Sequence, residues 1–144
     1  MNLYADTSLL VSYYITDVNS ARAQALIHST PNALLFTGLH RLELRTAFEL
    51  GVFRKVLTPA QSRAAWKAVE QDLKAGRLLA HALNWVPVFR VAAQLATRHA
   101  ASFGCRSLDI LHVALAEKIK APEFYSFDTR QRGLAQSVGL AVRP

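Results

Sequence analysis

The sequence predicts an α/β fold with parallel strands. Two observations point to it: short apolar runs alternate with segments of helical spacing along all 144 residues, and two of those runs end at an aspartate. Residues 2–5 lead into Asp6, and residues 123–127 lead into Asp128. A parallel strand would deliver each aspartate to the carboxyl edge of a sheet, where open α/β sheets bind ligands. We therefore expect the functional site at that edge.

Length and composition restrict the class of protein. We expect a single domain over residues 1–144, because a chain of this size can bury a real core. A hydrophobic fraction of 51% excludes a disordered chain. No apolar run approaches the ~18 residues of a membrane span, and the start lacks the basic region of a signal peptide. The single cysteine, Cys105, cannot form an intramolecular disulfide, so we expect a cytoplasmic protein with a buried thiol and no membrane partner.

The first half of the chain predicts alternating strands and helices. Ser20 is placed to cap a helix that runs to His28, because a serine side chain can accept hydrogen bonds from the first backbone amides of a helix. Residues 40–53 have helical spacing, with Leu42, Leu50 and Phe53 among the apolar positions. The other elements expected here are a strand at 2–5, a helix at 7–14 and a strand at 33–36.

The second half contains the strongest helix start signal. Thr58 can cap, Pro59 suits the first helical position and Gln61 fits the third, and this helix is expected to end near Gly76. Ser107 is expected to cap a later helix. The apolar residues of that later helix are spaced for a buried stripe and are Leu108, Leu111, Leu115 and Ile119. The other expected elements are a strand at 78–80, a helix at 84–103, a strand at 123–127, a helix at 129–136 and a strand at 140–142.

Four of the ten acidic residues occur at separated points along this pattern: Asp6, Glu43, Asp109 and Asp128. A hard divalent cation such as Mg²⁺ binds oxygen ligands and keeps several waters, so three or four carboxylates suffice to hold it. The pattern therefore predicts a Mg²⁺ or Mn²⁺ site. Such a site can activate a water molecule and polarise a phosphodiester.

Three of the four acidic residues also have an ordinary structural explanation. Asp6 could cap the helix that follows it, and Asp109 could interact with the dipole of its helix from the first turn. Glu43 is flanked by two arginines and could belong to a solvated charge cluster, although its own helical face is mostly apolar. His112 lies one turn from Asp109 and could either reach the same pocket or be a core histidine.

Basic residues outnumber acidic ones by 17 to 10, which gives a net charge of +7 and an isoelectric point near 10.1. This balance is typical of a protein that binds an anionic polymer, and it also fits a generally basic surface. Five arginines lie close in sequence to a predicted metal ligand, where they could line a channel for a phosphate backbone or simply be solvated. They are Arg41, Arg45, Arg106, Arg130 and Arg132.

Taken together and in order, the segments around the four acidic residues resemble the PIN domain family over nearly the whole chain. These segments are Asp6-Thr-Ser, Arg-Leu-Glu43-Leu-Arg, Ser-Leu-Asp109-Ile-Leu-His-Val-Ala-Leu-Ala, and Ser-Phe-Asp128 followed by a helix and Gly139-Leu-Ala-Val. More narrowly, the sequence is similar to the VapC-type toxin ribonucleases of bacterial toxin–antitoxin pairs. The resemblance depends on all four segments, because any one of them occurs in many unrelated proteins.

The resemblance implies a three-layer α/β/α sandwich with a mostly parallel sheet of about five strands. It also implies an endoribonuclease that hydrolyses RNA with Mg²⁺ or Mn²⁺. Asp6 and Asp109 would then ligate the ion directly. Glu43 and Asp128 would complete the acidic pocket, by direct ligation or by holding a metal-bound water.

Substrate contacts and partners follow from the same resemblance. Thr7 and Ser8 are expected to donate hydrogen bonds to the scissile phosphate or to Asp6. The arginines expected to bind the RNA substrate are Arg45, Arg106 and Arg130. The helical pair joined at residues 53–57 is expected to contribute to a homodimer and to the docking of a cognate antitoxin, although ordinary burial would also explain the apolar residues there.

Two other classes of protein compete with this interpretation. A receiver-type phosphoacceptor domain also places aspartates at strand ends, but it requires an early acidic pair and a late lysine, and neither is evident here. A catalytically inactive PIN-like module, acting as an RNA-binding or regulatory protein, would have the same pattern. Metal affinity together with RNA turnover distinguishes the three.

Overall fold

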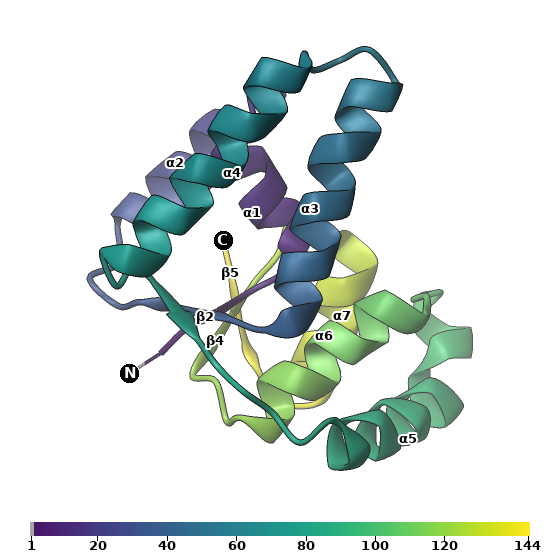
Figure 1. Ribbon diagram of the computed structural model, residues 1–144. Coiled ribbons are helices and arrows are strands. Elements are labelled where there is room, and N and C mark those ends of the chain that lie inside the picture. Colours follow the sequence, from purple (N-terminus) through teal and green to yellow (C-terminus); the bar gives the residue numbers. More distant parts are fainter. Residues whose placement is uncertain (1) are drawn as a thin grey trace. The chain divides into compact units, whose positions relative to one another are not determined.

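The computed structural model describes residues 2–144, so residue 1 of the predicted domain lies outside the described part. The chain forms two compact units (Figure 1): residues 2–6 and 83–144 belong to unit 1, and residues 7–82 form unit 2. The elements, in chain order, are β1 Tyr4–Ala5, α1 Thr7–Tyr14, α2 Ser20–His28, β2 Leu34–Phe36, α3 Gly38–Phe53, α4 Pro59–Lys74, β3 Leu78–Ala80, α5 Trp85–Phe103, α6 Ser107–Lys118, β4 Glu123–Tyr125, α7 Thr129–Ser137 and β5 Ala141–Arg143.

Three parallel strands form the sheet of unit 1, in the order β1-β4-β5. The β1–β4 register pairs Tyr4 with Phe124, and their buried rings stack with centroids 5.8 Å apart. The pairing continues past the end of β1, because the backbone N–H of Asp6 donates to the carbonyl of Tyr125 at 2.8 Å. Asp6 therefore lies at the carboxyl edge of this sheet, as the sequence predicted.

The helices of unit 1 are α5, α6 and α7, which contact one another. Every residue of α6 from Ile110 to Ala116 is buried, as expected for a helix in a protein interior. α5 ends at Gly104, whose φ of +67° lies in the left-handed region that glycine adopts without strain. Gly133 allows α7 to approach α5 closely, since a Cβ at this position would lie 2.9 Å from the ring of Phe103.

Unit 2 consists of α1 to α4 and the parallel pair β2–β3. α3 and α4 run side by side as a helical hairpin (Figure 1). The core of the unit includes Phe48 from α3 and Val69 from α4. A polar link crosses the hairpin as well, because the hydroxyl of Ser62 donates to the carboxylate of Glu49 at 3.0 Å.

The predicted α/β class with parallel strands is confirmed. Residues 2–144 contain five strands and seven helices, and all the strand pairs in this range are parallel. The strands are hydrogen-bonded as a set of three in unit 1 and a set of two in unit 2. Among the described residues, none of the helices combines the length and the apolar character needed to cross a membrane.

Thr58 caps α4 as predicted. Its hydroxyl accepts a hydrogen bond from the backbone N–H of Gln61 at 3.1 Å, and the Gln61 side chain accepts one from the backbone N–H of Thr58 at 2.8 Å. Pro59 occupies the first turn, where its missing N–H has no helical partner to lose. This reciprocal pair of hydrogen bonds explains why the start of α4 could be located from the sequence.

The two predicted serine caps are wrong. The cap residue of α2 is Asn19, and the hydroxyl of Ser20 donates instead to a backbone carbonyl in the preceding turn. The cap residue of α6 is Arg106, and Ser107 is the first helical residue. In α6 the N-terminal backbone amide is satisfied by Asp109 instead, whose carboxylate accepts from the N–H of Arg106. This contact is the second half of a capping box, in which the residue three positions along accepts from the N–H of the cap residue, and it differs from the contact expected of a capping serine.

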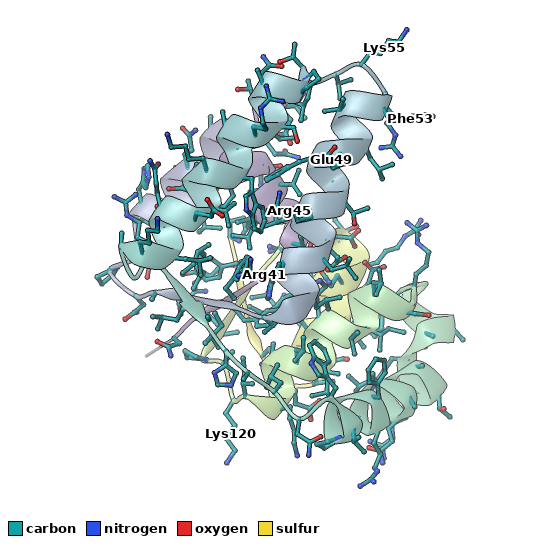
Figure 2. All side chains as sticks on the ribbon, in the orientation of Figure 1. Arg41, Arg45, Glu49, Phe53, Lys55 and Lys120 are labelled. Carbon is teal, nitrogen blue, oxygen red and sulfur yellow. The ribbon has the colours of Figure 1, made fainter. Side chains whose placement is uncertain are left out.

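Several apolar side chains are more exposed than the sequence pattern suggests. Leu108 was predicted to belong to the buried stripe of α6, but it is half exposed. Leu111 and Leu115, from the same predicted stripe, are buried. Phe53 is 83% exposed and Val56 is also exposed, so ordinary burial does not explain the apolar residues between α3 and α4. Figure 2 shows Phe53 at the end of the α3–α4 hairpin.

Replacing Thr58 with alanine should lower the free energy of unfolding by about 1 kcal/mol, because the N–H of Gln61 loses its acceptor. Urea denaturation followed by circular dichroism would measure this loss. Thr46→Ala is a matched control, since Thr46 is an exposed residue inside α3 and its hydroxyl bonds back to the carbonyl of Leu42. An equal loss in both variants would contradict the capping role of Thr58.

Candidate active site

Asp6 is the most buried of the four predicted acidic residues, with 7% of its surface exposed. Its Oδ1 accepts a hydrogen bond from the side-chain amide of Gln131 at 3.4 Å and lies 3.7 Å from Nε2 of His112. The other ring nitrogen of His112 is 2.6 Å from the hydroxyl of Tyr4. His112 is thus a core histidine with a polar partner, and it lies beside the carboxylate that the sequence predicted as a metal ligand.

Gln131 connects the residues at this edge of unit 1. Its side-chain amide group donates to Oδ1 of Asp6 and, at 3.2 Å, to the backbone carbonyl of Asp109. Its carbonyl oxygen accepts from the hydroxyl of Ser126 at 2.7 Å, and its backbone N–H donates to the carboxylate of Asp128 at 2.9 Å. The side chain is fully buried. One residue therefore contacts Asp6, Asp109 and Asp128 together.

Asp109 and Asp128 both lie at helix starts. Oδ2 of Asp109 accepts from the backbone N–H of Arg106 at 3.1 Å, and Oδ1 of Asp128 accepts from the backbone N–H groups of Arg130 and Gln131 at 2.9 Å. Structural roles of the kind offered as alternatives to metal binding are therefore present. They are compatible with metal binding, because a carboxylate has two oxygens and about four lone pairs.

These carboxylates interact electrostatically with the thiol of Cys105. The thiol is buried, as predicted. Burial raises the pKa of this thiol above its ordinary value of 9.0. The carboxylates of Asp109 and Asp128 raise the pKa further, while the guanidinium of Arg130 lowers it. The thiol is therefore protonated at neutral pH, and its pKa reports on the net charge around Asp109 and Asp128.

The remaining predicted residues of the acidic site lie in unit 2. Thr7 begins α1 and follows Asp6 directly in the chain. Its hydroxyl donates to the carboxylate of Glu43 at 3.0 Å, and both side chains are at least partly buried. Glu43 therefore points inward, as its helical face predicted, and it has a polar partner. Ser8 is exposed on the first turn of α1.

Two arginines of unit 2 are stacked on an aromatic ring. The guanidinium of Arg45 lies 3.7 Å from the centre of the Trp66 ring, and that of Arg41 lies 5.5 Å from the centres of both Trp66 and Phe36. Figure 2 shows Arg41 and Arg45 on the side of α3 that faces α4. Trp66 itself is buried, as expected for a core residue. Stacking holds the exposed guanidinium groups in defined positions.

The predicted arginines of unit 1 have different surroundings. Arg106 and Arg130 are exposed, and the side chain of Arg130 lies close to Gly104, 3.9 Å from where a Cβ would be. Arg132 is not simply a solvated surface residue, because its guanidinium donates to the carbonyls of Ser126 and Pro144. Arg106 and Arg130 thus remain available for an anionic ligand, whereas Arg132 stabilises the chain.

The donors at this edge fit a hard divalent cation. They are carboxylate oxygens, which suit Mg²⁺ and Mn²⁺ better than they suit softer metals. In the described range 2–144, no three His, Cys, Asp or Glu side chains are close enough together to form a metal cage. Mg²⁺ is held by one or two carboxylates, with waters and substrate phosphates completing its coordination. Gln131 contacts the carboxylate of Asp6 and the backbone carbonyl of Asp109, so these two residues lie close together at this edge of unit 1.

The sequence pattern does not indicate that Gln131, Ser126 or Tyr4 belongs to this site. Tyr4 and Ser126 lie in apolar runs that read as buried strands. Gln131 stands three residues after Asp128, where a glutamine in a helix start turns back to the cap residue. In the structure its side chain turns into the interior instead, which spacing alone does not reveal.

Solved structures share this fold over nearly the entire chain. FitAcB from Neisseria gonorrhoeae is 22% identical with a TM-score of 0.67, and the match covers 100% of this chain and 97% of that one. VapC20 from Mycobacterium tuberculosis, a toxin that cleaves the sarcin–ricin loop, is 20% identical with a TM-score of 0.69 and 99% coverage of both chains. VapBC2 from Rickettsia felis, bound to a promoter DNA fragment, is 14% identical with a TM-score of 0.66, and the match covers 99% and 98%.

At these identities the solved structures establish a shared fold. Among curated protein sequences, none matches the chain. The family comparison is more direct, because the model of the PIN domain matches residues 3–136. That range includes Asp6, Glu43, Asp109 and Asp128 in the order that the sequence resemblance required. The chain therefore belongs to the PIN domain family.

Proposed function

We propose that this chain is a divalent-metal-dependent endoribonuclease that hydrolyses RNA phosphodiester bonds, and that it is the toxin of a type II, VapBC-like pair. The observation that carries the proposal is the link from Gln131 to Asp6 and to the backbone of Asp109 at the carboxyl edge of β1. Family membership supports a nuclease. The likeness to VapC20, described as a toxin that cleaves the sarcin–ricin loop, supports RNA as the substrate.

In this proposal Asp6 and Asp109 would ligate Mg²⁺ or Mn²⁺ directly, and Glu43 and Asp128 would complete the acidic pocket, by direct ligation or by holding a metal-bound water. The chemistry of such a cation is the activation of water for in-line attack and the neutralisation of charge on the leaving oxygen. The burial of Asp6 excludes bulk water from one side of the site. Its hydrogen bond from Gln131 orients the carboxylate.

The substrate is held by hydroxyls and guanidinium groups. Thr7 donates to Glu43, and Ser8 is exposed one residue further along α1. We assign to these two residues hydrogen bonds to the scissile phosphate or to Asp6. Arg45, Arg106 and Arg130 bind the phosphate backbone of RNA. The stacking of Arg45 on Trp66 reduces the conformational entropy that this guanidinium loses on binding.

We further propose that both units act as a single nuclease domain in the cytoplasm and that the protein pairs with an antitoxin and forms a homodimer. The family match from residue 3 to residue 136 spans both units. Phe53, the last residue of α3, and Val56, between α3 and α4, are exposed apolar side chains of the kind found at protein interfaces. The solved neighbour VapBC2 supports an antitoxin as the partner. A catalytically inactive PIN-like module is the alternative.

Asp6→Asn and Asp109→Asn should each reduce metal-dependent RNA cleavage by at least about 100-fold, because loss of a ligand costs more than loss of a residue that merely orients one. The assay would use a mixed pool of transfer and ribosomal RNA, the purified full chain free of any partner, and Mn²⁺, Mg²⁺ or EDTA. Glu117→Gln is the matched control, since Glu117 is exposed on α6, the same helix as Asp109.

Cleavage that persists in EDTA or in Asp109→Asn would overturn the metal-dependent mechanism. A wild-type chain that binds metal and RNA but cleaves none of the RNAs would favour the inactive binding module. Circular dichroism of each variant would verify that the fold is intact.

Mg²⁺ should increase the alkylation rate of Cys105 at pH 8. The Asp109 and Asp128 carboxylates raise the thiol pKa, so a bound cation that offsets their charge lowers this pKa and increases the reactive thiolate fraction. Mass spectrometry after iodoacetamide treatment would measure the rate. Asp109→Asn should react faster than the wild type without metal and should respond little to Mg²⁺. An unchanged wild-type rate at saturating Mg²⁺ would argue against a cation at these carboxylates.

Arg45→Ala should weaken RNA binding for all sequences and reduce the salt dependence of binding by about one counterion. The reason is that this stacked guanidinium is assigned to a phosphate rather than to a base. Fluorescence anisotropy with a labelled oligoribonucleotide in EDTA would measure binding without cleavage. Arg63→Ala is the control, because it removes the same charge from an exposed position on α4. Equal salt slopes in the two variants would contradict a specific role for Arg45.

A further inference from the structure

We propose that Gln131 is a positioning residue that sets the metal affinity of the acidic site by fixing Asp6 relative to Asp109. This inference rests on the proposed function, since it concerns the same site. Gln131 is the point where three acidic positions meet: its side chain contacts Asp6 and the backbone of Asp109, and its backbone N–H contacts Asp128. All three contacts use uncharged N–H groups: the side-chain amide donates to Asp6 and to the carbonyl of Asp109, and the backbone amide donates to Asp128.

The orientation of the Gln131 amide follows from its surroundings. The Nε2 group faces two acceptors, Oδ1 of Asp6 at 3.4 Å and the carbonyl of Asp109 at 3.2 Å. The Oε1 atom faces the hydroxyl of Ser126 at 2.7 Å. A flipped amide would point its oxygen at two other oxygens and would be repelled. The hydroxyl of Ser126 is itself fixed, because it accepts from the backbone N–H of Asp128 at 3.1 Å.

A neutral donor suits a carboxylate that has to bind a cation. Hydrogen bonds from Gln131 offset part of the desolvation of Asp6, which is almost fully buried. They do so without cancelling its negative charge. A lysine or arginine in the same place would also satisfy Asp6, but its positive charge would oppose the approach of Mg²⁺. The amide thus orients Asp6 and leaves its charge for the ion.

The 3.4 Å separation from Asp6 is longer than an average N–H···O hydrogen bond. The contact to the Asp109 carbonyl and the contact to Ser126 are shorter and hold the Gln131 side chain from two sides. These two hydrogen bonds fix the position of the Gln131 amide, and the amide in turn orients the carboxylate of Asp6. Removing the amide would let the Asp6 carboxylate rotate away from Asp109, which raises the cost of bringing two ligands to one ion.

Gln131→Met tests this role. Methionine has a similar length and lacks both the N–H donors and the oxygen acceptor of the side-chain amide, while the backbone N–H that bonds Asp128 is retained. Calorimetric titration of the full chain with Mn²⁺, without RNA, should show a loss in affinity of about 10–100-fold, the usual effect of removing a residue that orients a metal ligand. Ser126→Ala, which leaves Gln131 but removes the hydroxyl that holds its amide oxygen, should show a smaller loss in the same direction.

Leu134→Ala is the matched control, because Leu134 is a buried apolar residue on the same helix, α7. It should lower the melting temperature and leave the Mn²⁺ affinity unchanged, which separates positioning from general stability. Equal affinity in Gln131→Met and the wild type, or an equal loss in Leu134→Ala, would overturn the role of Gln131 and leave the proposed nuclease standing. A wild-type chain that binds no Mn²⁺ would overturn the metal site and this proposal with it.

Discussion

The burial of the Asp6 carboxylate constrains much of unit 1. A carboxylate at the end of a buried strand is costly unless hydrogen-bonding groups surround it. The helices of this unit supply them: α6 places His112 beside Asp6, and α7 directs the amide of Gln131 to it. His112 is held in turn by the hydroxyl of Tyr4. Polar side chains are therefore found in an otherwise apolar interior because one carboxylate requires them.

The start of α7 couples helix capping to the site. Asp128 caps the helix by accepting from the backbone of Gln131, and the hydroxyl of Ser126 bonds both the backbone of Asp128 and the side chain of Gln131. The same few hydrogen bonds thus determine where α7 begins and which way the amide of Gln131 points. Asp109 likewise makes two contacts. Its carboxylate accepts from the backbone N–H of Arg106 at the start of α6, and its backbone carbonyl accepts from the side chain of Gln131. In both cases a structural role and a proposed metal-binding role belong to one residue.

The charges of unit 2 are arranged by a different kind of contact. Arg45 and Arg41 stand one turn apart on α3 and share the ring of Trp66. Two guanidinium groups repel each other in water, and the face of an aromatic ring offsets part of that repulsion while limiting their motion. Glu43, between them in sequence, turns away and accepts from Thr7. One helix therefore presents exposed cations and, separately, an inward carboxylate, which suits a protein that has to bind an anionic polymer and a metal ion.

The sequence by itself determined the α/β class, the parallel strands, the order of the elements and the position of Asp6 at a strand end. These features depend on local spacing and on residues such as Thr58, Pro59 and Gln61, whose helix-starting hydrogen bonds join neighbours in the chain. The serine caps failed by one position, because each serine is the first residue of its helix and the cap residues before them are Asn19 and Arg106. A single polar residue does not fix a helix start to one position. Only the tertiary structure decided that Gln131 meets Asp6, because these residues are 125 positions apart and their contact depends on how α7 packs in unit 1, where it contacts α6 and the strand β5 of the sheet that includes β1. A hydrogen bond across that distance leaves no periodic signal in the sequence.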